Sequence, residues 1–322
     1  MVRRIRGTRK LALWAAAATA VPVGVMLTAT PANAATGSLV VTTLGREGTK
    51  VATTVTVTDT HDLNVYTVSS GKKLSLPDAT YDVMVDVYDP KDDTDTFGAR
   101  VLRVTGATTT TIDARKGKPL TVSLDQDPGA GYSERVYADI CATGGIGFAS
   151  GENFGGHVYV IPDSSSHLQF AYLATWQPTS SRHETYLVSH ETQGVPSGVS
   201  TTYRVAALAK VAVAERSGPG AGEQTDLTIT PQNTVSNTDC RAWLFAGDDA
   251  GTTPWTTTAH VSPGRWIVRS DEFAPHGDET WDVGTWSKNV TLTAGESSAW
   301  TFYRSGFGPG TDLPLTLSKT LN

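Results

Sequence analysis

Residues 81–88 read Tyr81-Asp82-Val83-Met84-Val85-Asp86-Val87-Tyr88, and this run decides the fold. Successive side chains of a β-strand point to opposite faces, so an alternating run predicts a strand with two different faces. Here Tyr81 and the valines would point inward, and Asp82 and Asp86 would point outward to solvent. Similar runs, separated by polar turns, occur at 51–58, 101–104, 108–112 and 120–124.

Strand-like runs continue toward the C-terminus, and helical periodicity is almost absent after residue 34. We expect further strands at 137–141, 157–161, 168–176, 185–189, 202–214 and 289–293. Short strands with polar turns between them are typical of β-sandwiches. The sequence therefore predicts a mainly β protein of two or more immunoglobulin-like or prealbumin-like β-sandwich units in tandem.

The first 34 residues carry the pattern of an export signal. A head with five basic residues and no acidic one precedes an apolar run from Leu11 to about Leu27, and Ala32 and Ala34 match the small-residue pattern that signal peptidase accepts. A membrane-spanning anchor needs about 20 strongly apolar residues, and this run is short and rich in alanine. We therefore expect residues 1–34 to be a signal peptide and the mature chain to be secreted, with no membrane insertion.

Two breaks rich in Gly and Pro divide the mature chain, at 127–131 and 217–222. Such clusters mark turns and linkers between structured segments. They predict three regions: an N-terminal β-sandwich at 35–126, a middle β-rich region at 132–215 and a Trp-rich C-terminal β-sandwich at 223–322.

The chain contains two cysteines, Cys141 and Cys240. In an oxidising compartment a lone pair usually forms a disulfide, so we expect this bridge. Two buried free thiols are the alternative, and a zinc site is excluded because there is no Cys-x-x-Cys pair. The bridge would cross the second break, so the middle and C-terminal regions would then form one unit.

A weak internal repeat supports the double sandwich. The stretch from Leu76 to Val83 (LPDATYDV) resembles the stretch from Val261 to Val268 (VSPGRWIV). Each contains a turn with proline, followed by an aromatic residue that opens an alternating strand.

Three short stretches resemble a known family. Residues 101–122, with the preceding 76–83, and residues 299–309 are similar to the β-rich regions outside the catalytic domain in large secreted subtilisin-like serine peptidases of actinobacteria. The resemblance implies an accessory architecture and no peptidase activity. The family's nucleophile sits in a Gly-Thr-Ser motif that this chain lacks, and there is no room for its α/β catalytic domain.

Charge and motifs point to a binding role. Without residues 1–34 the chain has 21 basic and 32 acidic residues, a net charge of −11, which disfavours nucleic acids and anionic membranes. The Gly-x-Ser-x-Gly motif is absent, and the Gly-rich run at 144–156 is followed by no predicted helix, which a phosphate-binding loop requires. We expect a non-catalytic extracellular or cell-wall binding or accessory module, whose partner is an unknown extracellular protein or polysaccharide.

Tryptophans in the C-terminal region suggest an alternative, a carbohydrate-binding function. Trp255, Trp281 and Trp286 lie in loop-like or polar contexts, and exposed aromatic rings can anchor a partner. Core packing is the competing interpretation, because tryptophan is mostly buried.

Two sets of residues suggest metals. The acidic loop with Asp92, Asp93 and Asp95 supplies oxygen ligands for Ca²⁺, although it does not match the EF-hand pattern and a solvated turn is the alternative. A metal-dependent secreted hydrolase would instead use four residues: His157, His183, His190 and Glu191. A β-strand between His183 and His190 would argue against this site, because residues seven apart on a strand point to opposite faces. No other cofactor is expected.

Overall fold

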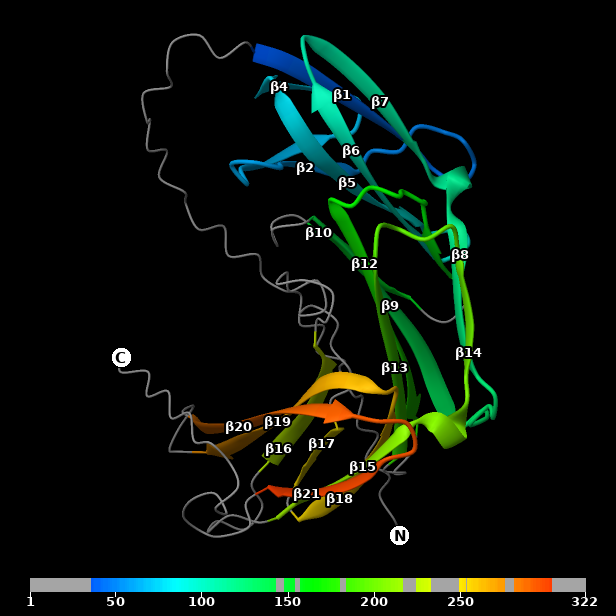
Figure 1. The fold of residues 1–322 in the computed structure, drawn as a ribbon, viewed down its shortest axis with the longest axis vertical. Helices are drawn as coiled ribbons and strands as arrows, with labels where there is room; N and C mark the ends of the chain where they lie inside the picture. Colours follow the sequence, from blue (N-terminus) through cyan, green and yellow to red (C-terminus); the bar gives the residue numbers. More distant parts are fainter. Residues whose placement is uncertain are drawn as a thin grey trace, which may run out of the picture. The chain divides into compact units, whose positions relative to one another are not determined.

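The computed structural model describes residues 36–142, 148–153, 157–179, 184–216, 224–232, 249–252, 254–275 and 281–302. The chain divides into two units, Met1–Ala34 and Ala35–Asn322, and all described residues belong to the second. They are mainly β-strand (Figure 1), with two short 3₁₀ helices, η1 (Ala114–Lys116) and η2 (Val205–Ala207). The predicted fold class is thus confirmed. None of the described segments is a helix that could cross a membrane.

The described strands form four sheets. Sheet 1 has the order β4 (Lys73–Pro77), β1 (Thr36–Leu44), β7 (Ala107–Asp113). Sheet 2 has the order β14 (Val199–Tyr203), β8 (Lys118–Leu124), β11 (Val158–Val160), β6 (Thr94–Val104), β5 (Ala79–Asp89), β2 (Thr54–Asp59), β3 (Val65–Ser69). Sheet 3 has the order β10 (Phe148–Asn153), β9 (Tyr132–Ala142), β12 (Leu168–Pro178), β13 (Glu184–Gln193), β18 (Trp255–Val261), β15 (Ala209–Glu215), β21 (Ser297–Phe302). Sheet 4 has the order β17 (Asp249–Thr252), β16 (Gln224–Pro231), β19 (Gly264–Pro275), β20 (Trp281–Leu292).

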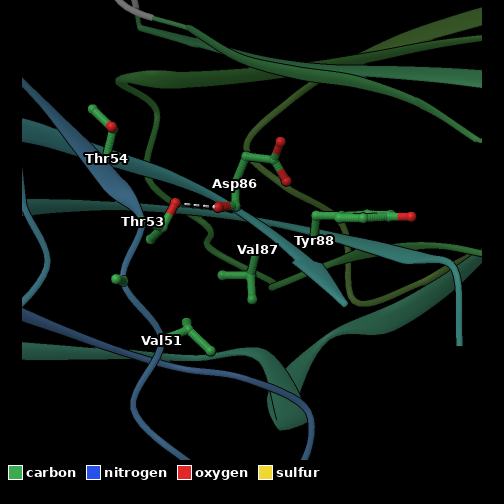
Figure 2. A pocket seen from close by; sticks show the side chains of 7 residues that line it. Val51, Thr53, Thr54, Asp86, Val87 and Tyr88 are labelled. Carbon is green, nitrogen blue, oxygen red and sulfur yellow. Dashed lines mark hydrogen bonds between the residues drawn. The ribbon is translucent and has the colours of Figure 1, made fainter. Parts of the chain in front are cut away.

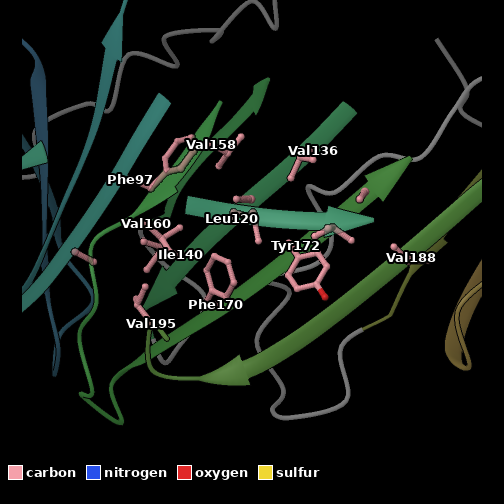
Figure 3. Close-up of a cluster of buried hydrophobic side chains, with 14 of the residues drawn as sticks. Phe97, Leu120, Val136, Ile140, Val158, Val160, Phe170, Tyr172, Val188 and Val195 are labelled. Carbon is pink, nitrogen blue, oxygen red and sulfur yellow. The ribbon is translucent and has the colours of Figure 1, made fainter. Parts of the chain in front are cut away.

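Three hydrophobic cores join these sheets in sequence, so sheets 2 and 3 each serve two cores. The N-terminal core combines residues of sheets 1 and 2, such as Leu39 and Tyr81. The central core combines sheets 2 and 3 through side chains such as Phe97 and Phe170 (Figure 3). The C-terminal core combines sheets 3 and 4 around Trp266. The layers therefore form tandem sandwiches that share their sheets.

Strand β5 shows how a shared sheet changes the environment of its residues. Tyr81 and the valines of the strand fill the N-terminal core, while Met84 on the opposite face belongs to the central core. Asp82 shares that second face, and its residue exposure is only 1%. Burial raises the pKa of Asp82 to about 6. The expectation that Asp82 points to solvent is wrong, because sheet 2 is covered on both faces, and Asp86 is half-buried rather than freely exposed.

Strand pairing crosses both predicted breaks. Strands β11 and β14, from the middle region, pair with β6 and β8 in sheet 2, and β13 pairs with β18 in sheet 3. The predicted strand at 202–214 is in fact two strands, because η2 interrupts it and the chain passes from sheet 2 to sheet 3. Asp125 fixes this turn by accepting a hydrogen bond from the Val205 amide at 2.8 Å. The three-region division stays a prediction, and these regions share their sheets.

The internal repeat corresponds to two similar turns. The Tyr81 hydroxyl donates to the carbonyl oxygen of Pro77 at 2.8 Å. The Trp266 indole donates to the carbonyl oxygen of Ser262, also at 2.8 Å. Both rings are fully buried, so each satisfies its polar atom inside the core through the turn that precedes its own strand.

Candidate functional site

A pocket opens where the pairing of β2 with β5 ends. The ladder runs from Asp59↔Tyr81 to Val55↔Val85, and the segment before β2 then leaves β5. The resulting cavity has a volume of about 350 Å³. Figure 2 shows its lining, which comprises Val51, Ala52, Thr53, Thr54, Asp86, Val87 and Tyr88.

One side-chain hydrogen bond still links the two backbones beside the pocket, beyond the last strand pair. The Thr53 hydroxyl donates to the carbonyl oxygen of Asp86 at 2.8 Å (Figure 2). The Thr53 carbonyl oxygen accepts from the Ser70 amide at 2.9 Å. A side chain therefore replaces the backbone donor that a continued ladder would supply, and the two backbones diverge around the pocket.

Asp86 gives the pocket its charge. Burial raises the pKa of this carboxyl group to about 7, and repulsion from the carboxylate of Asp95 adds to the effect. The buried Oδ1 atom of Asp86 has no hydrogen-bond partner among the described residues. A cationic group beside Asp86 would offset both the burial and the repulsion, so this geometry suits an ammonium or guanidinium group.

Tyr88 provides an aromatic surface on the same strand. It is 54% exposed, and its hydroxyl donates to Oδ1 of Asp93 at 3.1 Å. In a β-strand, side chains two residues apart share a face, so Tyr88 lies on the face of Asp86. An accessible tyrosine ring beside a carboxyl group can attract a cation through both its π-electrons and the charge.

The predicted calcium ligands do not gather. Asp92 and Asp93 are exposed in the loop, whereas Asp95 is 7% exposed on β6. The carbonyl oxygen of Asp92 instead lies 3.0 Å from Nδ1 of His157. No group of three or more His, Cys, Asp or Glu side chains within the described ranges is arranged to hold a metal ion.

The other predicted metal residues do not form a described site either. His190 is exposed and Glu191 is buried, as alternation along β13 requires. His183 lies outside the described residues. Cys141 is buried on β9 and is not a free thiol, while Cys240 also lies outside the described residues, so their bridge stays a prediction.

Two of the three tryptophans predicted to form a binding surface pack against a hydrophobic core. Trp255 and Trp286 pack against the C-terminal core. The indole of Trp255 donates to Oγ1 of Thr225 at 2.7 Å. Trp281 lies on β20, and its side chain is outside the described set. Core packing, the competing interpretation, accounts for the two described rings, and their role in binding stays untested.

Sequence reasoning missed a second polar cluster on the β13–β18 ladder. Nε2 of His260 lies 2.6 Å from Oε1 of Glu184. The His260 ring stacks on Tyr186, with ring centroids 4.8 Å apart. Because the two rings cover each other, this cluster has less open aromatic surface than Tyr88. Only the register of β13 against β18 brings these residues together, and no local pattern encodes it.

Comparisons with known proteins identify no family. No protein-family model and no curated protein matches the chain. Among solved structures, the chain is similar to the Bacillus anthracis TIE protein, with 12% identity, 83% of this chain and 51% of that chain covered, and a TM-score of 0.19. It is also similar to a Streptococcal ancillary pilin, with 9% identity, 83% of this chain and 98% of the pilin covered, and a TM-score of 0.17. A third similar structure is the pilus adhesin SpaC from Lactobacillus rhamnosus GG, with 10% identity, 81% of this chain and 40% of SpaC covered, and a TM-score of 0.17.

The chain thus spans about half the length of the TIE protein. At these TM-scores the similarities carry no argument about site or function.

Proposed function

We propose that this chain is exported and acts outside the cell as a non-catalytic β-sandwich binding module. Its binding site is the pocket at the end of β5, and the group it receives is a cationic side chain or amine of an extracellular partner. The observation that carries the proposal is the accessible ring of Tyr88 beside the half-buried carboxyl group of Asp86.

Export is supported by the basic, apolar and small-residue pattern of residues 1–34. A cationic partner is supported by the charge of the mature chain, which has 21 basic and 32 acidic residues. Complementary charge accelerates association and selects among partners. The sequence resemblance suggests that the module works beside secreted peptidases, and this association belongs to the proposal.

The pocket favours an organic cation over a metal ion. Ca²⁺ takes six to eight oxygen ligands, and the described residues around Asp86 form no metal-binding group. An ammonium group needs fewer partners and can also contact the face of an aromatic ring. Lysine and arginine side chains and free amines therefore fit the chemistry of the lining.

Binding of a short oligolysine peptide, measured by calorimetry at about 0.15 M salt, tests this proposal. We expect Asp86→Asn to weaken binding about tenfold, because a charge-assisted hydrogen bond contributes about 1.5–3 kcal/mol. We expect Tyr88→Ala to weaken it less, because an exposed cation–π contact contributes about 0.5–1 kcal/mol.

The matched control is Asp62→Asn, which removes the same charge from the exposed loop between β2 and β3. It should leave the affinity within about twofold, since exposed charges are screened by solvent and salt. Equal weakening by Asp86→Asn and Asp62→Asn would show that the peptide responds only to the net charge of the protein, which would overturn the proposal. Equal binding of the lysine-acetylated peptide would also overturn the proposal.

A further inference from the structure

Two side-chain hydrogen bonds cross between sheets 3 and 4 at one end of the C-terminal core. Ser270 on β19 donates from Oγ to Oε2 of Glu215 on β15, at 3.1 Å. Trp255 on β18 donates from Nε1 to Oγ1 of Thr225 on β16, at 2.7 Å. Glu215 and Trp255 are partners in the β15–β18 ladder, so the two bonds lie side by side.

The carboxyl group of Glu215 is buried in the interface between sheets 3 and 4. It is 1% exposed and Ser270 is fully buried. The second oxygen of Glu215, Oε1, has no hydrogen-bond partner among the described residues. Burial raises the pKa of Glu215 to about 7, and the hydrogen bond from Ser270 acts in the opposite direction.

The described groups around Glu215 do not supply a counter-charge. Trp255 of β18 and Phe302 of β21 flank it in sheet 3, and Ser270 faces it from sheet 4. The ammonium group of Lys288, on β20, lies 4.7 Å from the centroid of the Trp300 ring. It is not among the groups that shift the pKa of Glu215. Within the described part of this interface, the negative charge would therefore be unpaired.

We propose that the Glu215–Ser270 bond is a proton-dependent clasp between the two sheets of the C-terminal sandwich. A neutral Glu215 side chain fits the interface and holds β15 against β19. Loss of the proton places a charge between the sheets and favours their local separation, which would expose the indole of Trp255.

The pH range follows from linkage. The folded-state pKa of Glu215 is about 7, above its ordinary value of 4.5. A raised folded-state pKa means that the clasp is strongest below about pH 4.5 and weakens as the pH rises from there. The weakening levels off near pH 7, where the closed form also loses its proton.

Hydrogen exchange of the intact mature chain tests the clasp through the variant Glu215→Gln. Glutamine has nearly the same shape, can accept the Ser270 hydrogen bond and does not titrate. The ratio of wild-type to variant exchange rates cancels the intrinsic effect of pH on exchange. In peptides from β16 and β19 we expect this ratio to rise about tenfold per pH unit from about 4.5 and to level off near 7.

Peptides from β1 and β4, in sheet 1, are the internal control, and their ratio should stay constant with pH. In the second variant, Ser270→Ala, the charged form of Glu215 loses a stabilising donor. The ratio of the exchange rate in Ser270→Ala to that in Glu215→Gln should then keep rising to a higher pH than the wild-type ratio does. A constant ratio in β16 and β19 between pH 4 and 8 would overturn the proposal, as would an equal rise in β1 and β4.

Discussion

Tyr81 and Trp266 occupy equivalent positions in two turns that are far apart in the sequence. Each ring is buried, and each donates at 2.8 Å to the carbonyl oxygen four residues earlier, in Pro77 and Ser262 respectively. Each turn leads into a strand that crosses a core, β5 in one case and β19 in the other. The two bonds thus anchor one long strand in the N-terminal core and one in the C-terminal core.

Removing the Tyr81 hydroxyl should reveal the contribution of this turn. We predict that Tyr81→Phe lowers the free energy of unfolding by about 1–2 kcal/mol, because the Pro77 carbonyl loses its donor and the apolar ring remains. Urea unfolding measures the change. Tyr88→Phe, at an exposed ring, is the control and should unfold like the wild type, whereas an equal loss in both variants would show that the turn bond is not the cause.

The pH dependence of cation binding follows from the raised pKa of Asp86, which is about 7. Below this pH the carboxyl group keeps its proton and attracts a cation weakly. We predict that the affinity for oligolysine rises about tenfold between pH 6 and 8. Calorimetry at the two pH values measures the rise, and Asp86→Asn should abolish it. An undiminished rise in that variant would assign the titration to another group.

Asp139 should make the protein less stable as the pH rises. It is 1% exposed on β9, and burial raises its pKa from 3.8 to about 8. Because the folded-state pKa is raised, its stabilising effect is complete below about pH 4 and is lost as the pH rises toward 8. We predict that Asp139→Asn removes this loss, so the variant gains stability relative to wild type across that range. The measurement is the unfolding midpoint of wild type and of Asp139→Asn from pH 4 to 8. A constant difference between the two midpoints would contradict this prediction.

The N-terminal region should not fold by itself as a native sandwich. Strands β11 and β14 pair with β6 and β8 in sheet 2, and both follow residue 126. A fragment of residues 35–126 would expose Phe97 and Leu120 of the central core. We predict poor dispersion of its amide resonances compared with the mature chain. A well-dispersed spectrum with the same N-terminal shifts would show that this region is autonomous.

The predicted bridge between Cys141 and Cys240 can be tested by mass. An oxidised pair lowers the mass of the intact chain by about 2 Da relative to the reduced chain. We predict this difference, together with a loss of about 2–5 kcal/mol of stability on reduction. Labelling of two thiols by iodoacetamide in the unreduced, unfolded chain would contradict the bridge.

Local sequence was sufficient for the fold class but not for the environment of polar residues. The alternation in 81–88 correctly predicted a strand and its inward valines, because side-chain direction depends only on the strand itself. It could not show that the second face of β5 is also covered, since that cover comes from strands beyond residue 131, such as β10. Asp82 therefore looked exposed and is buried.

The candidate site was missed for a related reason. The acidic loop after Asp89 can be recognised from its composition, whereas the pocket depends on where the β2–β5 ladder ends. The alternating run at 51–58 includes Thr53, but β2 begins at Thr54, and the Thr53 hydroxyl binds the Asp86 carbonyl. Trp255 and Trp286 lie in loop-like or polar sequence contexts, and only packing shows their contact with the core.

Nuclear magnetic resonance mapping of an oligolysine titration on the mature chain tests the binding site most directly. If the pocket receives the cation, the largest amide shifts will fall at residues 51–54 and 86–88, and the Asp86 carboxyl carbon will shift toward its ionised value at pH 7. Shifts that are largest elsewhere on the acidic surface, with residues 86–88 unchanged, would contradict the account.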